Sequence, residues 1–340
     1  YDVVIRNGNV YNGTGTQPVV ADVAIKGDKI VRVARNFPGK GKIEIDANGL
    51  AVSPGFINML SWATTSLIAD GRSLSDIKQG VTLEVFGEGW SMGPLNEKMR
   101  EQQLADITEF KYEIDWITLG EYLEALESRG ISMNVASLVG ATTVRIHEIS
   151  FDNRPPTEGE LENMKSLVLR AMEDGALCVG SSLIYAPAFY SSTQELIELC
   201  KIASEYDGMY ISHMRSESNR FLESLDELIT ISEKANISAE IYHLKAGGTP
   251  NHYKMDLAIE KINEARERGL KITTDMYLYV AGATGLNAHM PPWVQEGGYD
   301  KWVERLKDPE IRKRVKQEMI TDTDDWENLG FLAGPECCFL

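Results

Sequence analysis

Two histidines, His213 and His243, each end an apolar segment of the chain. His213 follows residues 209–212 and His243 follows residues 239–242, so the two ends lie 30 residues apart with one helical pattern between them. That spacing is typical of one strand–helix unit in a parallel α/β sheet. Because α/β barrels keep their active sites at the C-terminal ends of successive strands, both imidazoles are expected in one site. Imidazole is a common metal ligand, so we interpret the pair as metal-binding or catalytic; the alternative is two ordinary hydrogen-bonded core residues.

A carboxylate, Glu88, follows another predicted strand, residues 81–86, and lies between two glycines that let the backbone bend. Since side chains alternate along a strand, Glu84, Phe86 and Glu88 are expected on one side of it. Glu88 is therefore a candidate to face the same pocket as the two histidines, and the alternative is a solvated loop acid. The remaining histidines share loop or helix-face positions, where we expect structural or solvent-exposed roles: His147, His252 and His289.

Three further side chains near predicted strand ends are candidates for substrate binding or proton transfer. Lys245 lies two residues beyond His243, and alternation would point it the same way, which suits an anionic group on a substrate. Tyr185 follows the predicted strand 176–181 and would hydrogen-bond a substrate or simply pack at the site. Asp275 ends the predicted strand 271–275, where it is either a base or a cap of the following loop.

The first part of the chain, residues 1–53, predicts a small all-β module. Short apolar strand patterns are separated by turn residues, among them Asn7-Gly8-Asn9 and the hairpin signal Lys26-Gly27-Asp28. The expected strands cover residues 1–6, 22–25, 29–33, 42–46 and 50–52. This module is expected to be part of a small β-sandwich domain.

From residue 54 the pattern changes to strands that alternate with helices, which is typical of a parallel α/β sheet. The expected strands are 55–59, 81–86, 132–139, 176–181, the two ending at His213 and His243, and 271–275. Seven units suggest a barrel, although eight are needed to close one. After the seventh strand the chain continues through a charged helix near 301–320. Because an open barrel leaves unpaired strand edges, we expect residues 54–340 to be a barrel whose C-terminal end is missing, unless another element fills the gap.

The composition is ordinary for a soluble globular enzyme. Of the 340 residues, 43% are hydrophobic and 25% are charged, and the formal net charge is -17. That charge opposes binding to nucleic acid and to anionic membrane surfaces. No apolar run approaches the ~20 residues that span a bilayer, and four cysteines do not form a disulfide framework. The chain begins at Tyr1 without a methionine or a signal peptide, as a mature or trimmed product would, so the compartment, cytoplasmic or periplasmic, and the oligomeric state are left open.

Several segments together resemble the D-aminoacylase (N-acyl-D-amino-acid deacylase) family of the amidohydrolase superfamily. The most specific are Ser212-His213-Met214-Arg215-Ser216-Glu217 and Pro291-Pro292-Trp293, and the others are residues 45–49, 54–57, 80–82, 243–245 and 275–279. The resemblance covers nearly the whole chain. It implies a (β/α)8 TIM barrel of the metal-dependent hydrolase type beside a small β-sandwich, with zinc at the mouth of the barrel.

The family pattern implies that His213 and His243 bind zinc and that Glu88 is the third ligand, at a place where many members carry cysteine. Glutamate is a harder ligand but a workable one for zinc. The superfamily's His-x-His at the end of the first barrel strand is absent, because Leu60 and Trp62 occupy those places. One zinc ion is therefore expected. The family's catalytic Asp lies on strand eight, beyond the last residue, as does the rest of the sandwich.

The function implied by the resemblance is zinc-dependent hydrolysis of the linear amide of N-acyl-D-amino acids to a carboxylate and a free D-amino acid. By family pattern Tyr185, Lys245 and Tyr279 are candidates to hold the substrate's carboxylate and acyl oxygen, and Asp275 is a weak substitute for the missing base. Two alternatives remain open. One is a related cyclic-amide or dipeptide hydrolase on the same barrel, and the other, suggested by the missing histidines, is a catalytically degenerate binding protein.

Overall fold

The computed structural model describes residues 1–105, 111–279 and 281–334. The chain forms two compact units: one comprises Tyr1–Ile57 and Asp76–Thr82, and the other Asn58–Ser75 and Leu83–Leu340. Across the described ranges, every helix is too short or too polar to span a lipid bilayer.

The N-terminal segment forms a mixed five-stranded sheet in the order β3-β2-β1-β4, with β5 also paired to β1. The strands are β1 (Val3–Val10), β2 (Val19–Lys26), β3 (Lys29–Ala34), β4 (Ile43–Asp46) and β5 (Ala51–Val52). The hairpin predicted at Gly27 is confirmed between the antiparallel β2 and β3. The turn predicted at Asn7–Asn9 is wrong, because β1 runs through it. Asn7 has a φ of 59° and the pairing with β2 shifts between Ile5 and Gly8, so the polar residues form a β-bulge within a continuous strand.

The larger unit is built from strands that alternate with helices, as predicted. The strands that follow β5 are β6 (Phe56–Asn58), β7 (Val81–Phe86), β8 (Asn134–Ser137), β9 (Val139–Gly140), β10 (Cys178–Ser182), β11 (Met209–His213), β12 (Ser238–Ile241) and β13 (Ile272–Thr274). Of these, only Asn58 of β6 and the part of β7 from Leu83 onward belong to the larger unit, together with all of β8 to β13. They lie in the orders β6-β7-β8 and β9-β10-β11-β12-β13, and the pairs from β9 to β13 and between β7 and β8 are parallel. β8 and β9, separated by Leu138, correspond to the single strand predicted over 132–139. The α/β class is therefore confirmed.

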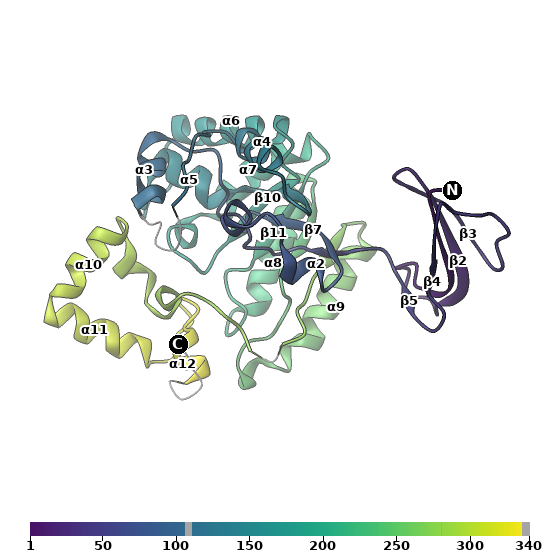
Figure 1. Ribbon diagram of the computed structural model, residues 1–340. Helices are drawn as coiled ribbons and strands as arrows, with labels where there is room; N and C mark the ends of the chain where they lie inside the picture. The colour runs from purple at the N-terminus through teal and green to yellow at the C-terminus, as the bar shows by residue number, and fades with distance from the viewer. Residues whose placement is uncertain (106–110, 280, 335–340) are drawn as a thin grey trace. The chain divides into compact units, whose positions relative to one another are not determined.

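Helices pack against the strands of this unit: α7 lies against β10 and β11, and α6 lies against β9 (Figure 1). The described helices are α1 (Ser66–Ala69), α2 (Leu74–Ile77), α3 (Glu97–Ala105), α4 (Leu119–Arg129), α5 (Ala141–Ile149), α6 (Glu158–Glu173), α7 (Thr193–Ser204), α8 (Phe221–Ala235), α9 (Lys254–Glu267), α10 (Tyr299–Lys307), α11 (Pro309–Met319) and α12 (Leu329–Ala333). A capping box begins α6: the Thr157 side chain accepts the backbone N–H of Glu160, and the Glu160 carboxylate accepts that of Thr157.

Each central strand is buried on both faces, which explains the continuous apolar runs in the sequence. One face packs against the helices, with Tyr210 and Ile241 among the residues of this core. The other face forms a second cluster between the strands, made of Val85, Leu138, Cys178, Ile211 and Tyr242. Since the strands from β9 to β13 are parallel, their carboxyl ends meet at one edge of the sheet. The residues expected to carry chemistry follow these ends.

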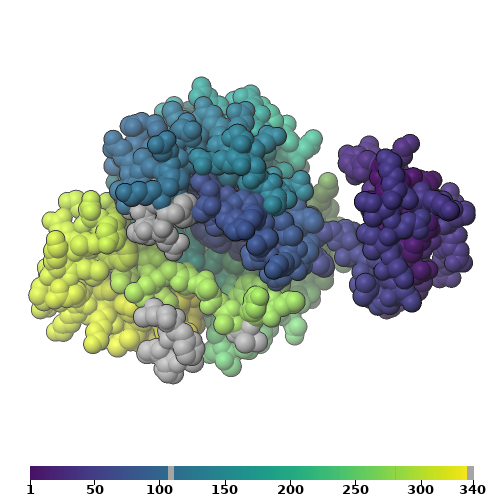
Figure 2. Space-filling view, viewed as in Figure 1, coloured from purple at the N-terminus to yellow at the C-terminus, as the bar shows by residue number. Residues whose placement is uncertain are grey.

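The charged helix predicted near 301–320 is wrong as a single helix. It is divided into α10 and α11 at Asp308, whose side chain caps α11 by accepting the backbone N–H of Glu310, and Pro309 begins the new helix. In the space-filling view this C-terminal segment, shown in yellow, forms a continuous part of the surface of the larger unit (Figure 2).

Candidate metal centre

The ends of β7, β11 and β12 bring Glu88, His213 and His243 together. One ligand atom from each lies within 4.8 Å of the others, and in the described part of the chain no other three His, Cys, Asp or Glu residues meet this spacing. The three residues are only 5%, 7% and 7% exposed. Glu88 Oε1 lies 3.3 Å from His213 Nδ1, and the two imidazole rings meet edge to face with centroids 4.6 Å apart. The structure thus gathers the three predicted metal ligands in one buried cluster.

Two glycines give Glu88 its position. Gly87 and Gly89 have φ values of 113° and 68°, which residues with a Cβ rarely adopt. A Cβ on Gly87 would lie 2.6 Å from the carbonyl oxygen of Leu138, so the loop also approaches its neighbour too closely for a side chain. The expectation that Phe86 and Glu88 share one side of the strand is wrong, because the backbone bends at Gly87. Phe86 packs edge to face against Tyr122 in the core shared with the helices.

The bend brings the Glu88 carboxylate to the end of β10. There the Ser182 hydroxyl donates a hydrogen bond to Glu88 Oε1 at 2.9 Å. The same oxygen faces His213 Nδ1, so one carboxylate oxygen links β10 and β11.

His243 lies beyond the end of its strand in an unusual backbone conformation. β12 ends at Ile241, two residues earlier than predicted, and His243 has a φ of 36°. Such a conformation in a residue other than glycine costs free energy and persists only where its surroundings hold it. The Asp275 carboxylate supplies one support, because its Oδ1 accepts the backbone N–H of His243 at 2.6 Å. Burial raises the pKa of Asp275. Through its hydrogen bond with the backbone N–H, Asp275 supports the conformation of His243.

Glu217 is the site residue that sequence reasoning missed. Its carboxylate is buried, with Oε1 2.9 Å from His243 Nδ1 and Oε2 3.8 Å from His213 Nε2. Burial, the largest influence, would raise the pKa of Glu217, but the positive charge of His213, the hydrogen bond from His243 and the charge of Lys245 lower it to about 2. The signal in the sequence is its spacing, four residues after His213 in the family-specific segment.

Lys245 points to this cluster, as alternation predicted, but it is engaged there. Its Nζ lies 2.7 Å from Glu217 Oε2, donates to Glu217 Oε1 at 2.8 Å and lies 2.9 Å from His243 Nδ1. The carboxylates also act on His213. Burial, the largest influence, lowers the pKa of His213, yet Glu217 and the hydrogen bond with Glu88 raise it above the ordinary value. The cluster therefore favours positive charge at this imidazole.

The donor set fits zinc. Two imidazoles and one carboxylate are among the ligand sets of catalytic zinc sites. Among the described residues the buried Nε2 of His213 has no hydrogen-bond partner, since Glu217 Oε2 is too distant to be one. A buried nitrogen without a hydrogen-bond partner lowers the free energy of unfolding by roughly 1–3 kcal/mol, and a metal ion or another bound group would remove this loss.

The two candidate tyrosines differ in position. The Tyr185 ring lies 5.5 Å from the His213 ring, its hydroxyl is within 2.8 Å of Thr284 Oγ1, and burial raises its pKa to about 12. Tyr279 is 75% exposed and its ring lies beside that of Tyr277. Tyr277, not singled out from the sequence, lies closer to the cluster: its ring is 6.3 Å from the His243 ring and 5.6 Å from Lys245 Nζ.

The remaining predicted residues lie as follows. His147 is half-buried beside Glu148, His252 is exposed and His289 is half-buried. Leu60 is half-buried against the cluster between the strands, whereas Trp62 is 63% exposed.

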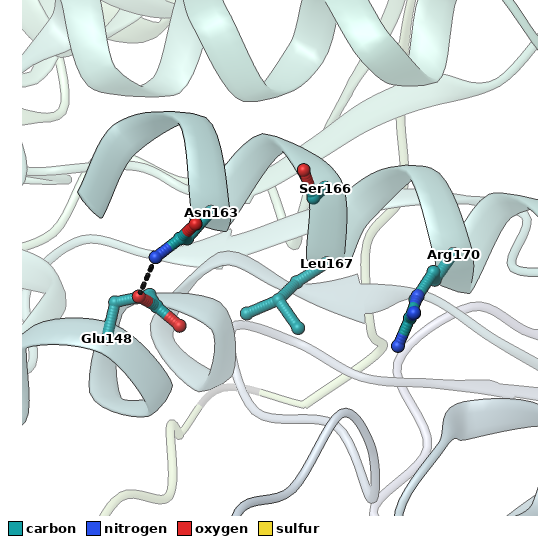
Figure 3. A pocket seen from close by; sticks show the side chains of 5 residues that line it. All are labelled: Glu148, Asn163, Ser166, Leu167 and Arg170. Atoms are coloured by element: carbon teal, nitrogen blue, oxygen red, sulfur yellow. Dashed lines mark hydrogen bonds between the residues drawn. The ribbon is translucent and has the colours of Figure 1, made fainter. Parts of the chain in front are cut away.

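Two surface hollows accompany these features. One, of about 80 Å³, is lined by Glu88 and Trp62 among others. The other, of about 220 Å³, is lined by Glu148, Asn163, Ser166, Leu167 and Arg170 and holds none of the candidate site residues; Figure 3 shows Asn163 donating a hydrogen bond to Glu148 there.

No family model matches the chain. Over 290 residues it is 30% identical to a D-aminoacylase from Alcaligenes xylosoxydans xylosoxydans, a match that covers 84% of this chain and 59% of that protein. A solved D-aminoacylase structure, described as having a binuclear metal centre with one-metal activation and second-metal attenuation, is 30% identical with a TM-score of 0.75 and covers 83% of this chain and 59% of that one.

A crystal structure of N-acyl-D-glutamate deacylase from Bordetella bronchiseptica is similar as well. It is 25% identical with a TM-score of 0.73, and the match covers 82% of this chain and 58% of that one. That protein was solved with zinc and a phosphonate inhibitor that mimics the tetrahedral intermediate of its reaction. The chain thus spans 58% to 59% of the length of these relatives.

Proposed function

We propose that this chain, which belongs to the D-aminoacylase (N-acyl-D-amino-acid deacylase) family of the amidohydrolase superfamily, carries the metal site of an N-acyl-D-amino-acid deacylase. The reaction is hydrolysis of a linear amide to a carboxylate and a free D-amino acid. The observation that carries the proposal is the buried cluster of Glu88, His213 and His243 at the strand ends. The 30% identity of the chain to a D-aminoacylase supports the proposed substrate class.

In this proposal Glu88, His213 and His243 hold one zinc ion. When bound, zinc supplies Lewis-acid chemistry: it polarises a carbonyl group and lowers the pKa of water. Glu217 supports the ligands, because its contact with His243 Nδ1 fixes the orientation of that imidazole. Leu60 and Trp62 cannot ligate a metal, which supports a single ion.

The substrate is oriented by side chains around the cluster. Lys245 attracts the carboxylate of the amino acid, and its present contacts with Glu217 hold the ammonium beside His243. Tyr185 donates a hydrogen bond toward the acyl oxygen, since its raised pKa keeps the hydroxyl protonated. Tyr279, exposed in this structure, binds the outer part of the substrate.

Proton transfer needs a base that accepts the proton of the attacking water and passes it to the leaving amine. By the family pattern this is an Asp on an eighth strand that follows β13 and closes the (β/α)8 barrel. Within the chain Asp275 is the substitute, although its Oδ1 is engaged with the backbone N–H of His243.

The test uses the full-length protein, stripped of metal and then loaded with zinc. N-acetyl-D-amino acids, their L-enantiomers, hydantoin and dihydroorotate are assayed for release of amine or opening of the ring. We expect zinc-dependent hydrolysis of the linear D-substrates alone. Opening of the cyclic amides instead would support the cyclic-amide hydrolase, and bound zinc with no hydrolysis would support a binding protein. Failure to bind zinc would overturn the metal site.

A further inference from the structure

A hollow of about 80 Å³ adjoins the candidate metal centre on the side of Glu88. It is lined by Ser61, Trp62, Thr64, Gly87, Glu88, Trp90, Ser91, Met92 and Gln103. The two tryptophans are 63% and 37% exposed, whereas Met92 is buried. The two indoles and Met92 give the hollow an apolar wall, and a tryptophan side chain buries a large apolar area when a ligand covers it.

Two serines of the hollow are engaged within the protein, whereas the buried Oε1 of Gln103 has no hydrogen-bond partner among the described residues. The Ser61 hydroxyl donates to Glu84 Oε2 at 2.7 Å, and the Ser91 hydroxyl donates to the carbonyl oxygen of Gly93 at 2.6 Å. The Ser91 hydroxyl also accepts the backbone N–H of Gly140 at 3.0 Å. These serines therefore offer a ligand little hydrogen bonding, and the indoles and Met92 form the apolar part of the lining.

Contacts at His213 put Glu88, which lines this hollow, and Glu217, which holds the lysine, at different nitrogens of the ring. Glu88 faces the Nδ1 of His213, whereas Glu217, which holds Lys245, faces the Nε2 of the same ring. A substrate whose carboxylate is attracted by Lys245, and whose amide carbonyl lies at the cluster, therefore extends its other end toward Glu88. That end is the acyl group, and the wall beyond Glu88 is formed by Trp62, Trp90 and Met92.

We propose that this hollow is the acyl-group subsite and that Trp62 and Trp90 give the enzyme a preference for short apolar acyl chains. The inference rests on the proposed deacylase function and names the part of the substrate that is selected. With a volume of about 80 Å³, the hollow takes only a small group of a few methyl- or methylene-sized units. Propionyl and butyryl groups fill it, and longer chains extend over the exposed indole of Trp62.

The test is a chain-length series on zinc-loaded full-length protein. The kcat/KM is measured for N-formyl, N-acetyl, N-propionyl, N-butyryl and N-hexanoyl derivatives of one D-amino acid. Because each buried methylene contributes about 0.8 kcal/mol, we expect kcat/KM to rise roughly threefold to fourfold per carbon up to butyryl and then to level off. The variant Trp62→Ala should flatten this rise with the zinc content unchanged. Met92→Ala should move the plateau to a longer chain.

A matched control is Tyr299→Ala, which removes an aromatic side chain of similar exposure at the start of α10, and the series should keep its slope. A second series holds the acetyl group constant and varies the D-amino-acid side chain. If Trp62→Ala changes this series and leaves the acyl series unaltered, the hollow binds the side chain and the proposal is overturned. The proposal is also overturned if kcat/KM of the unaltered protein does not change with the length of the acyl chain.

Binding without turnover separates this inference from the proposed function. Dissociation constants of acetate, propionate and butyrate, which have the chemistry of the acyl product, are measured on the zinc-loaded protein by calorimetry. Affinity that rises with chain length in the unaltered protein and not in Trp62→Ala supports the subsite even if no amide is hydrolysed. If the affinity for the three acids does not depend on their length while amide hydrolysis is normal, the proposed deacylase function stands and the acyl-group subsite is rejected.

Discussion

Replacing Glu88 with glutamine removes one negative charge from the candidate metal centre and keeps the size of the side chain. Glu88 Oε1 accepts a hydrogen bond from Ser182 at 2.9 Å and lies 3.3 Å from His213 Nδ1. A glutamine oxygen still accepts the serine hydroxyl, and the bend at Gly87 and Gly89 is independent of the charge. The substitution therefore separates the loss of a charged ligand from a change of structure.

We expect Glu88→Gln to weaken zinc binding at least 100-fold. Residues that only support metal ligands typically contribute roughly 10- to 100-fold to affinity, and a carboxylate in direct contact with the ion contributes no less. A 100-fold change is about 2.8 kcal/mol, because each factor of ten is about 1.4 kcal/mol. The dissociation constant is measured by competition with a chromogenic chelator at fixed neutral pH, and the melting temperature of the metal-free protein is recorded in parallel.

The matched control is Glu84→Gln, which changes a buried carboxylate of the same strand. Glu84 accepts hydrogen bonds from the Ser61 and Ser73 hydroxyls, each at 2.7 Å, and is not in the cluster of candidate ligands. This control should lower the melting temperature and leave zinc affinity within a factor of two or so. Equal zinc affinity in the unaltered protein and in Glu88→Gln would refute the reasoning and return Glu88 to the role of a loop acid.

Three further outcomes are expected. Zinc titration should saturate at one ion per chain, measured by metal analysis after dialysis; two tightly bound ions would mean that another residue replaces the missing histidines. Gly89→Ala should lower the free energy of unfolding, measured in urea, by at least about 1–2 kcal/mol, because alanine is strained in the left-handed backbone conformation of this position. The added Cβ would also lie 2.9 Å from Ser182 Cβ. The control is Gly159→Ala, where the added Cβ lies in open space on α6 and should stabilise the helix. Equal changes in the free energy of unfolding for the two variants would reject the steric argument. Burial raises the pKa of Glu327, so its ionisation opposes folding as pH rises above about 4.5. At pH 7 the free energy of unfolding of Glu327→Gln should therefore be no lower than that of the unaltered protein, and it should fall below that of the unaltered protein as the pH falls. The opposite trend would contradict a raised pKa of Glu327.

The sequence predicted the strand order and the three clustered side chains because both follow from local patterns. Strands buried on both faces read as apolar runs, and a polar residue that ends such a run must lie at the sheet edge. His213 and His243 are therefore found from periodicity alone. Glu88 needed the additional observation of its flanking glycines, and the positive φ values of Gly87 and Gly89 agree with that interpretation.

The features that the sequence did not predict depend on backbone direction and on long-range contacts. Strict alternation placed Phe86 and Glu88 together, but the bend at Gly87 ends the alternation that regular strand geometry requires. Glu217 is followed by a serine and preceded by one, so its neighbours do not distinguish it from a surface acid, and only its spacing of four residues after His213 in the family-specific segment does. Its importance arises from His243 and Lys245, which come from the next strand end. Similarly, the exposure of Trp62 depends on neighbours that its own segment does not specify.

The charges around the two histidines explain why a dication suits this position. Glu88 and Glu217 bring two negative charges into a buried cluster and Lys245 brings one positive charge, so with neutral histidines the cluster is negative. An unbalanced buried charge is costly, and the raised pKa of His213 shows that the cluster attracts a proton to compensate. The proposed zinc ion would compensate the same charge and would bind neutral imidazole. Proton and metal therefore compete for one ring, and zinc binding should release a proton that calorimetry in buffers of different ionisation enthalpy detects.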